Sequence, residues 1–378
     1  MQVPIRLVSL IRPSVPPGVL LAVGFSAVVL GSTPFLLDLV VAEYGISLIW
    51  ASMIGVAQLS GFVVGSWGSG RWLQPRRRVF VASLCVAMVA NLISTLLPPF
   101  AILVALRFIS GLALGLLTWF GWVQVFGEEK GMGDIAVMGP ITGIVSAPLI
   151  ATFAIGGATQ VFMLLAVLAV VPLLFNQGTG ANKTIPKKSS RSKPIPEATA
   201  ILVALGMFTL GGSSVFQFAV VLGTGRPALS VGTIALVFSA NAIAGIPGAK
   251  WPWSRGMPGA WMAITGCCAI IMANATSGPL FAAIVILWGF AFWMGIPGVF
   301  SVLAKRSANP ADRAGDAQAV MASGRIFGPL IGAVVLEALG ERALGLAGGG
   351  LMISAGAIVL ALQLRAPEQP TSLAGSGA

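Results

Sequence analysis

Four charged side chains that lie within long apolar stretches are the residues best suited to chemistry. They are Asp38, Arg107, Arg325 and Glu337. Such a carboxylate can take up and release a proton, and such a guanidinium can hold an anion, since a charge away from water needs a partner or a wet cavity. The chain has no histidine, no Cys/His cluster, no nucleophile–histidine pair and no phosphate-binding loop. The sequence therefore indicates no enzyme, no metal site and no cofactor.

Composition identifies the elements that must position these charges. Hydrophobic residues make up 57% of the 378-residue chain, charged residues 9%, and the mean hydropathy is +0.95, unlike any soluble globular domain. A hydrocarbon core of about 30 Å needs about 20 helical residues. The sequence predicts twelve spans, at 18–41, 48–70, 79–97, 101–124, 135–155, 161–175, 199–222, 230–248, 260–275, 280–304, 317–339 and 344–364.

Basic residues predict the orientation. With the N-terminus in the cytoplasm, the cytoplasmic loops and ends hold all 22 lysines and arginines except Arg226 and Arg342 in outer loops and the two arginines within spans. This asymmetry predicts cytoplasmic termini, and the short loops without large extramembrane domains favour an inner-membrane location. It also accounts for the net charge of +11. Basic runs such as PKKSSRSKP are therefore attributed to topology and contact with membrane lipids, and nucleic acid is excluded as a partner.

A polar segment divides the chain into two similar parts. Residues 177–198 are rich in Gly, Pro, Ser and Lys and predict a cytoplasmic linker between a six-helix bundle at 1–176 and another at 199–378. GPITG at 139–143 returns as GPLIG at 328–332, which is 189 residues later. Ser47, Gln58 and Gly65 match Ser230, Asn241 and Gly248 at a spacing of 183 residues. These matches predict a parallel duplication.

Three motifs together resemble the major facilitator superfamily over essentially the whole chain. They are RFISGLALG at 107–115, the partial antiporter-type motif GPITG, and the glycine-rich second span that leads to RWLQPRRR. The loop after the second span lacks the family's aspartate, which removes the usual charged lock. The resemblance implies an all-α membrane protein of twelve helices in two pseudo-symmetric six-helix bundles. It also implies a monomer that moves a small solute by alternating access.

Glycines and prolines within the spans indicate close packing and bends. Small residues let helices approach in lipid, and proline removes a backbone donor. By the resemblance, the second span should face the eleventh and the fifth should face the eighth, across seams that slide during transport. Static packing is the alternative for each glycine. The predicted packing or hinge residues are Gly65, Gly111, Gly115, Gly139, Pro140, Gly143, Gly248, Gly328, Pro329 and Gly332.

Asp38 and Arg107 form the predicted proton-coupling pair. Both lie near the outer ends of their spans, and the resemblance places these two spans side by side, so that protonation of Asp38 would release Arg107. The alternative is that both side chains simply reach the outer interface. Arg325 has two interpretations as well: it could hold an anionic solute in the cavity, or it could bond carbonyls near the Gly-Pro break.

A mostly apolar cavity with few polar groups is predicted for the solute. Such a cavity suits an amphipathic or drug-like molecule better than a sugar. The predicted solute-binding residues are Thr33, Arg107, Trp119, Ser213, Gln217, Trp288, Trp293 and Arg325. Interfacial or lipid-facing packing is the alternative for the aromatic residues. The leading function is proton-coupled efflux; an organic-anion carrier or uniporter, a receptor and a lipid scramblase are the alternatives.

Overall fold

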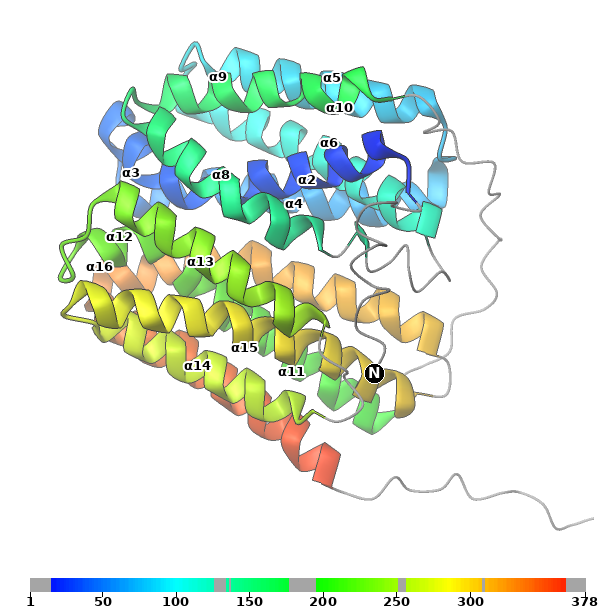
Figure 1. Ribbon diagram of the computed structural model, residues 1–378, viewed down its shortest axis with the longest axis vertical. Helices are drawn as coiled ribbons and strands as arrows, with labels where there is room; N and C mark the ends of the chain where they lie inside the picture. Colours follow the sequence, from blue (N-terminus) through cyan, green and yellow to red (C-terminus); the bar gives the residue numbers. More distant parts are fainter. Residues whose placement is uncertain are drawn as a thin grey trace, which may run out of the picture.

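Helices are the only regular elements in the described part of the chain, which covers residues 15–125, 134–135, 137–176, 195–250, 256–307 and 310–364 of a computed structural model. The helices up to residue 176 form one bundle, drawn at the top of Figure 1, and those from residue 196 form a second bundle below it. Positions 177–194 of the predicted linker lie outside the described residues. We call the two bundles the N half and the C half.

The helix bounds follow the predicted spans closely. The N half contains α2 (Pro17–Gly31), α3 (Thr33–Tyr44), α4 (Leu48–Trp72), α5 (Arg77–Ser94), α6 (Phe100–Val125), α8 (Met138–Ala154), α9 (Ala158–Leu168) and α10 (Val170–Leu174). The C half contains α11 (Pro196–Phe216), α12 (Ala219–Thr224), α13 (Val231–Lys250), α14 (Pro258–Asn274), α15 (Gly278–Lys305) and α16 (Pro310–Leu364).

Seven described helices are long and apolar enough to cross a membrane, or eight if the bent pair α2 and α3 is one span. Three further apolar stretches are shorter, at Met138–Ala154, Ala158–Leu174 and Pro258–Asn274. Helix α16 is interrupted at Gly340, whose φ of 82° is left-handed and favours glycine. These segments make a multi-pass membrane protein, and the count of twelve spans stays a prediction.

The first span is not continuous, in contrast to the prediction for 18–41. Helices α2 and α3 meet at Ser32 with a bend of 44°. Pro34 has no N–H to donate to the carbonyl of Leu30, four residues back. The hydroxyl of Thr33 donates to that carbonyl instead, at 3.2 Å. Hydroxyl side chains therefore satisfy the backbone where the helix is broken.

A second break lies at the corresponding place in the C half. The predicted span 199–222 divides into α11 and α12 at Gln217 and Phe218, and Phe218 has non-helical dihedrals. The first spans of both halves are therefore discontinuous. In transport proteins, broken helices at corresponding positions of two repeats are the best sequence-level and structural indication of a solute site.

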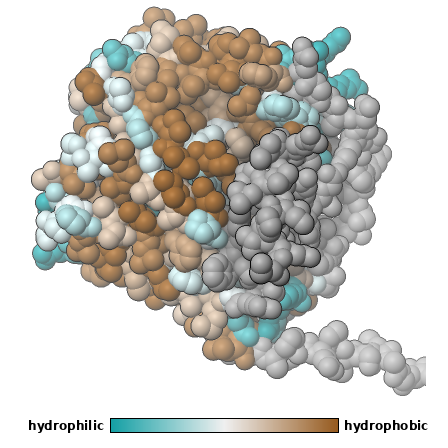
Figure 2. Space-filling view, viewed as in Figure 1, coloured by the Kyte–Doolittle hydropathy of each residue, from teal (hydrophilic) through white to brown (hydrophobic). Residues whose placement is uncertain are grey.

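The outer surface matches a membrane environment. Figure 2 shows apolar residues over most of the visible face, with hydrophilic residues mainly near its left and right margins. These margins are where the helices of Figure 1 end. An apolar belt with polar ends is what lipid tails and headgroups require.

Candidate functional site

Two seams join the halves. Helix α4 packs against α16, and α8 packs against α13, which confirms the helix pairs that the resemblance implied. In the first seam, the backbone N–H of Ile49 donates to Oε1 of Glu337 at 2.8 Å. In the second, the hydroxyl of Ser239 donates to the carbonyl of Ile144 at 2.6 Å. That carbonyl is available because Pro148, four residues later in α8, has no N–H.

An aromatic chain crosses from one half to the other near the broken helices. The ring of Phe35 in α3 meets that of Phe238 in α13 edge-on, with centroids 5.7 Å apart. Phe238 stacks with Phe216 at 5.4 Å, and Phe216 meets Trp288 at 5.4 Å. Of these four residues, only Trp288 was among the solute-binding residues predicted from the sequence. These mostly buried rings form a continuous aromatic contact at the junction of the two halves.

Side chains at both breaks lie beside Gly55 of α4. A Cβ atom placed on Gly55 of α4 would lie 3.2 Å from Cγ2 of Thr33 and 3.6 Å from Nε2 of Gln217. Nε2 of Gln217 is buried and has no hydrogen-bond partner among the described residues. Gly55 therefore lies against the methyl group of Thr33, at the first break, and close to the amide of Gln217, at the second. An amide donor without a protein partner at this point can bond an oxygen of a solute.

Asp38 lies on the inter-half side of α3. It follows Phe35 by three residues, which places both side chains on one face of the helix, and Phe35 contacts the C half. The side chain of Asp38 is exposed. Asp38 therefore lies within one turn of the residue through which α3 contacts the C half.

Arg107 does not pair with Asp38, which corrects the predicted proton-coupling pair. The guanidinium is fully buried and donates to Oδ1 of Asn91 at 3.0 Å and to Oγ of Ser94 at 2.8 Å, both in α5. It also lies 4.8 Å from the ring centroid of Phe162 in α9. Arg107 therefore points into the interior of the N half. Its acceptors there are an amide oxygen and a hydroxyl oxygen, and not the carboxylate of Asp38.

Arg325 is the other arginine within a predicted span, and it differs from Arg107. Its side chain is half-buried and has no hydrogen-bond or ion-pair partner among the described residues. The large side chains exposed on this part of α16 are Phe327, Ile331 and Val334. At about 100° per residue these three form one stripe, and Arg325 projects from roughly the opposite side of the helix. Arg325 is therefore turned away from the apolar stripe that suits lipid.

Solved structures share this arrangement of helices. The human organic anion transporter MFSD10 (TETRAN) is 15% identical, with 91% of this chain and 100% of that one covered and a TM-score of 0.63. The nucleoside transporter NupG is 14% identical, with 91% and 98% covered and a TM-score of 0.71. A POT family transporter in complex with a thioalcohol conjugated peptide is 14% identical, with 92% and 95% covered and a TM-score of 0.72.

The chain has the major facilitator fold. At these identities the likeness concerns the fold alone. No protein-family model matches the sequence, and neither does any curated protein sequence.

Three other residues that the sequence predicted to bind the solute make their contacts within one half. The hydroxyl of Ser213 donates to the carbonyl of Gly324 at 3.0 Å, which ties α11 to α16. Trp119 is buried in the core against Phe120. Trp293 packs edge-on against Phe292. Ser213 and Trp293 therefore join helices within the C half, since Trp293 of α15 also lies against Gly245 of α13, whereas the ring contact of Trp119 is with its neighbour in α6.

Most of the predicted hinge glycines also belong to contacts within a half. Gly65, Gly111 and Gly115 lie between α4 and α6, Gly248 lies between α13 and α15, and Gly328 and Gly332 lie between α16 and α11. Only Gly143 faces a seam, where an added Cβ would lie 3.1 Å from Cβ of Ala242, and Gly139 has open space around it.

The two predicted prolines differ in position. Pro140 is the third residue of α8, where an N–H has no helical partner, so this proline does not bend the helix. Pro329 lies inside α16 and removes a donor there.

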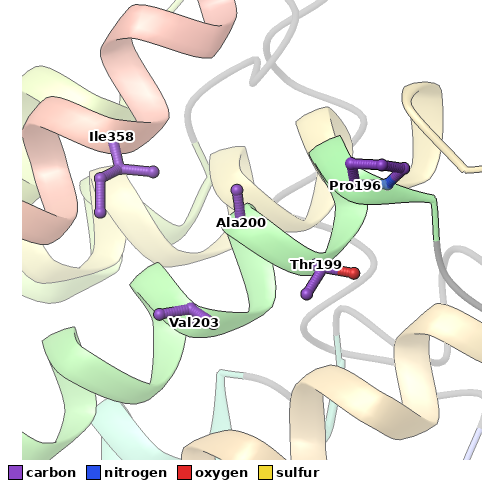
Figure 3. Close-up of a pocket in the computed structure, with 5 residues that line it drawn as sticks. All are labelled: Pro196, Thr199, Ala200, Val203 and Ile358. Carbon is purple, nitrogen blue, oxygen red and sulfur yellow. The ribbon is translucent and has the colours of Figure 1, made fainter.

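An open depression of about 550 Å³ lies elsewhere, at the N-terminal end of α11. Figure 3 shows its lining residues, four from α11 and Ile358 from the end of α16. Thr199 supplies the one side-chain hydroxyl of the lining, and this hydroxyl donates to the carbonyl of Ile195 at 3.1 Å. An apolar, shallow surface of this kind suits lipid contact better than solute binding.

Proposed function

We propose that the protein is a secondary transporter that moves a small organic, amphipathic or drug-like solute across the inner membrane by alternating access. The observation that carries this proposal is the meeting of two broken spans, one from each half, at Thr33, Gly55 and Gln217. A site shared by both halves can open to one side of the membrane or the other as the halves rock. The three solved transporters of similar fold support the same function.

The solute lies, in this proposal, between the aromatic chain and the free amide of Gln217. Rings of Phe35, Phe216 and Trp288 give apolar contact to an aromatic or aliphatic body. The amide donates to one oxygen of the solute. A site with many rings and few hydrogen-bonding groups favours an amphipathic solute over a sugar.

Proton-coupled efflux is the proposed mode, with Asp38 as the proton carrier. Asp38 alternates between charged and neutral forms at the inter-half face, without Arg107 as its partner. Closure of the halves would bury Asp38, and burial of a charged carboxylate is unfavourable. Protonation of Asp38 would therefore favour closure. Both termini are proposed to be cytoplasmic, and a monomer carries the complete pathway.

Purified protein in sealed liposomes with an internal pH dye tests this mode. A panel of lipophilic cations, neutral aromatics and organic anions is added, and solute-dependent proton movement is recorded. Asp38→Asn should lose at least about 90% of the proton movement while solute still binds, because the asparagine cannot carry a proton. Glu43→Gln is the matched control, since Glu43 is an exposed carboxylate of the same helix on a different face. Proton coupling that survives in Asp38→Asn would exclude Asp38 as the carrier.

An organic-anion carrier is the second candidate, and the observation that favours it is the unpaired Arg325. A guanidinium without a protein partner can hold a carboxylate or sulfonate of the solute. The similar fold of an organic anion transporter agrees with this candidate. Uptake of the organic anions should then fall about tenfold or more in Arg325→Gln, against little change in Arg342→Gln, an exposed arginine beyond the break in α16. Equal uptake by Arg325→Gln and the unaltered protein would remove this candidate.

A further inference from the structure

The outer end of the α4–α16 seam contains a hydrogen bond that joins the halves directly. Ile49 is the second residue of α4, so its N–H has no carbonyl partner within the helix. It donates to Oε1 of Glu337 at 2.8 Å. The carboxylate therefore caps the first turn of a helix in the N half from a position in the C half. A negative charge at a helix N-terminus is favourable because the helix dipole is positive there.

The equivalent helix of the other half is capped from within. Helix α13 corresponds to α4 in the sequence repeat, and Ser47 corresponds to Ser230. The N–H of Thr233 donates to Oγ of Ser230 at 3.1 Å, which is a local cap. No side-chain bond of this kind is formed by Ser47 in the described part of the chain. Helix α13 is thus capped by its own Ser230, whereas α4 is capped by Glu337 from the other half.

The repeat has no second copy of this carboxylate. At the spacing that matches GPITG with GPLIG, residue 337 corresponds to Pro148 of α8. Pro148 frees the carbonyl of Ile144, which accepts from Ser239. One seam is therefore joined through an ionisable group and the other through neutral groups only. A change of protonation can act on the α4–α16 seam without a counterpart at α8–α13.

Glu337 is well placed to exchange protons with the outer solution. Its side chain is exposed, and it forms no ion pair among the described residues. Helix α4 has no charged residue in its first three turns. Arg226, from the loop after α12, pairs with Glu341 at 3.0 Å. The remaining titratable or charged groups at this end are Asp38, Glu43 and Tyr44 on α3 and Arg342 on α16, and the hydroxyl of Tyr44 donates to the carbonyl of Pro98 at 2.7 Å.

We propose that Glu337 is a proton-responsive latch that holds the outer ends of the two halves together while its carboxylate is charged. A proton from the outer solution neutralises the carboxylate, weakens its bond to the N-terminus of α4, and lets the outer ends separate. This inference rests on the proposed alternating access, and it is independent of which solute is moved.

Distances between spin labels test the latch without any transport assay. One label is placed at Leu96 in the N half and one at Leu346 in the C half, both highly exposed and away from Glu337, after the three native cysteines are replaced by alanine. Protein in lipid nanodiscs without solute should show a larger population at long distance in Glu337→Gln and the largest in Glu337→Ala. The open-to-closed ratio should rise about threefold to tenfold in Glu337→Ala. Lowering the pH should open the unaltered protein and leave Glu337→Gln unchanged.

Glu341→Gln is the matched control, because it removes a carboxylate of the same helix that is paired within the C half. Its distance distribution should equal that of the unaltered protein. The latch is excluded if Glu337→Ala leaves the distribution unchanged, if Glu341→Gln opens the protein equally, or if Glu337→Gln keeps the full pH response. Opening without any solute flux in liposomes would leave the latch in place and reject the proposed function.

Discussion

Helix α4 is held differently along its two contact surfaces. Toward α6, within the N half, an added Cβ on Gly61 or Gly65 would lie 2.0 Å or 2.2 Å from a backbone oxygen of α6. Toward α16, in the C half, the one polar contact described is the bond from Ile49 to Glu337. Backbones in direct contact cannot slide without losing many van der Waals contacts, whereas one hydrogen bond can break and reform. The comparison indicates rigid halves joined by releasable seams.

The C half repeats this contrast. Within it, an added Cβ on Gly332 of α16 would lie 2.3 Å from the carbonyl oxygen of Ser214 in α11. Between the halves, α13 reaches α8 through Ser239 and the carbonyl freed by Pro148. Both seams therefore use backbone groups that lack a helical partner: an N–H in α4 and a carbonyl in α8. Such groups can bond across a seam or to water without disturbing a helix.

Gly111→Ala should have the largest effect on stability. Its Cβ would lie 1.9 Å from the backbone oxygen of Gln58, so α4 and α6 would have to move apart. We expect a loss of about 3 kcal/mol in the free energy of unfolding, at the upper end of overpacking costs. Thermal unfolding of the purified protein in detergent measures it. Gly143→Ala is the control in a seam, where the new Cβ would lie 3.1 Å from Cβ of Ala242 and little stability should be lost.

An equal loss of stability in the two variants would contradict the contrast between rigid halves and releasable seams. If Gly143→Ala lowered the unfolding temperature as much as Gly111→Ala, the seams would be packed as rigidly as the halves. Equal tolerance of both alanines would show instead that the α4–α6 contact can relax.

The sequence predicted the spans well because long apolar runs between polar loops are a property of composition. The prediction 48–70 agrees with α4 at Leu48–Trp72, and 101–124 agrees with α6 at Phe100–Val125. The break at Ser32 was missed although Pro34 lay within the predicted span. A proline predicts a lost hydrogen bond, but whether the helix bends or breaks depends on the groups that take up the freed carbonyl, here the hydroxyl of Thr33.

The hydrogen-bond partners of Arg107 could not be derived from composition, as the spans were. Its span is apolar around most of the helix, so the sequence does not say which face meets which neighbour. Charge alone favoured Asp38, whereas the structure supplies Asn91 and Ser94. A signal was present, since these two polar residues are spaced three apart in the predicted span 79–97 and so share a helix face. The resemblance placed the fourth span beside the first, but the side-chain direction was decided by packing.

Ser239→Ala should have the smallest effect, and it sharpens the comparison between the seams. The substitution removes the donor to the carbonyl of Ile144 and leaves both halves intact, so the unfolding temperature should stay unchanged. A net hydrogen bond contributes about 0.5–1.5 kcal/mol, which predicts a shift of about twofold to tenfold toward the open state. The same spin-label pair measures it. Ser214→Ala is the control, because its hydroxyl bonds the carbonyl of Gly211 within α11. Since this seam contains no ionisable group in the bond, the shift should be the same at every pH; a pH-dependent shift would mean that the two seams open as one coupled unit.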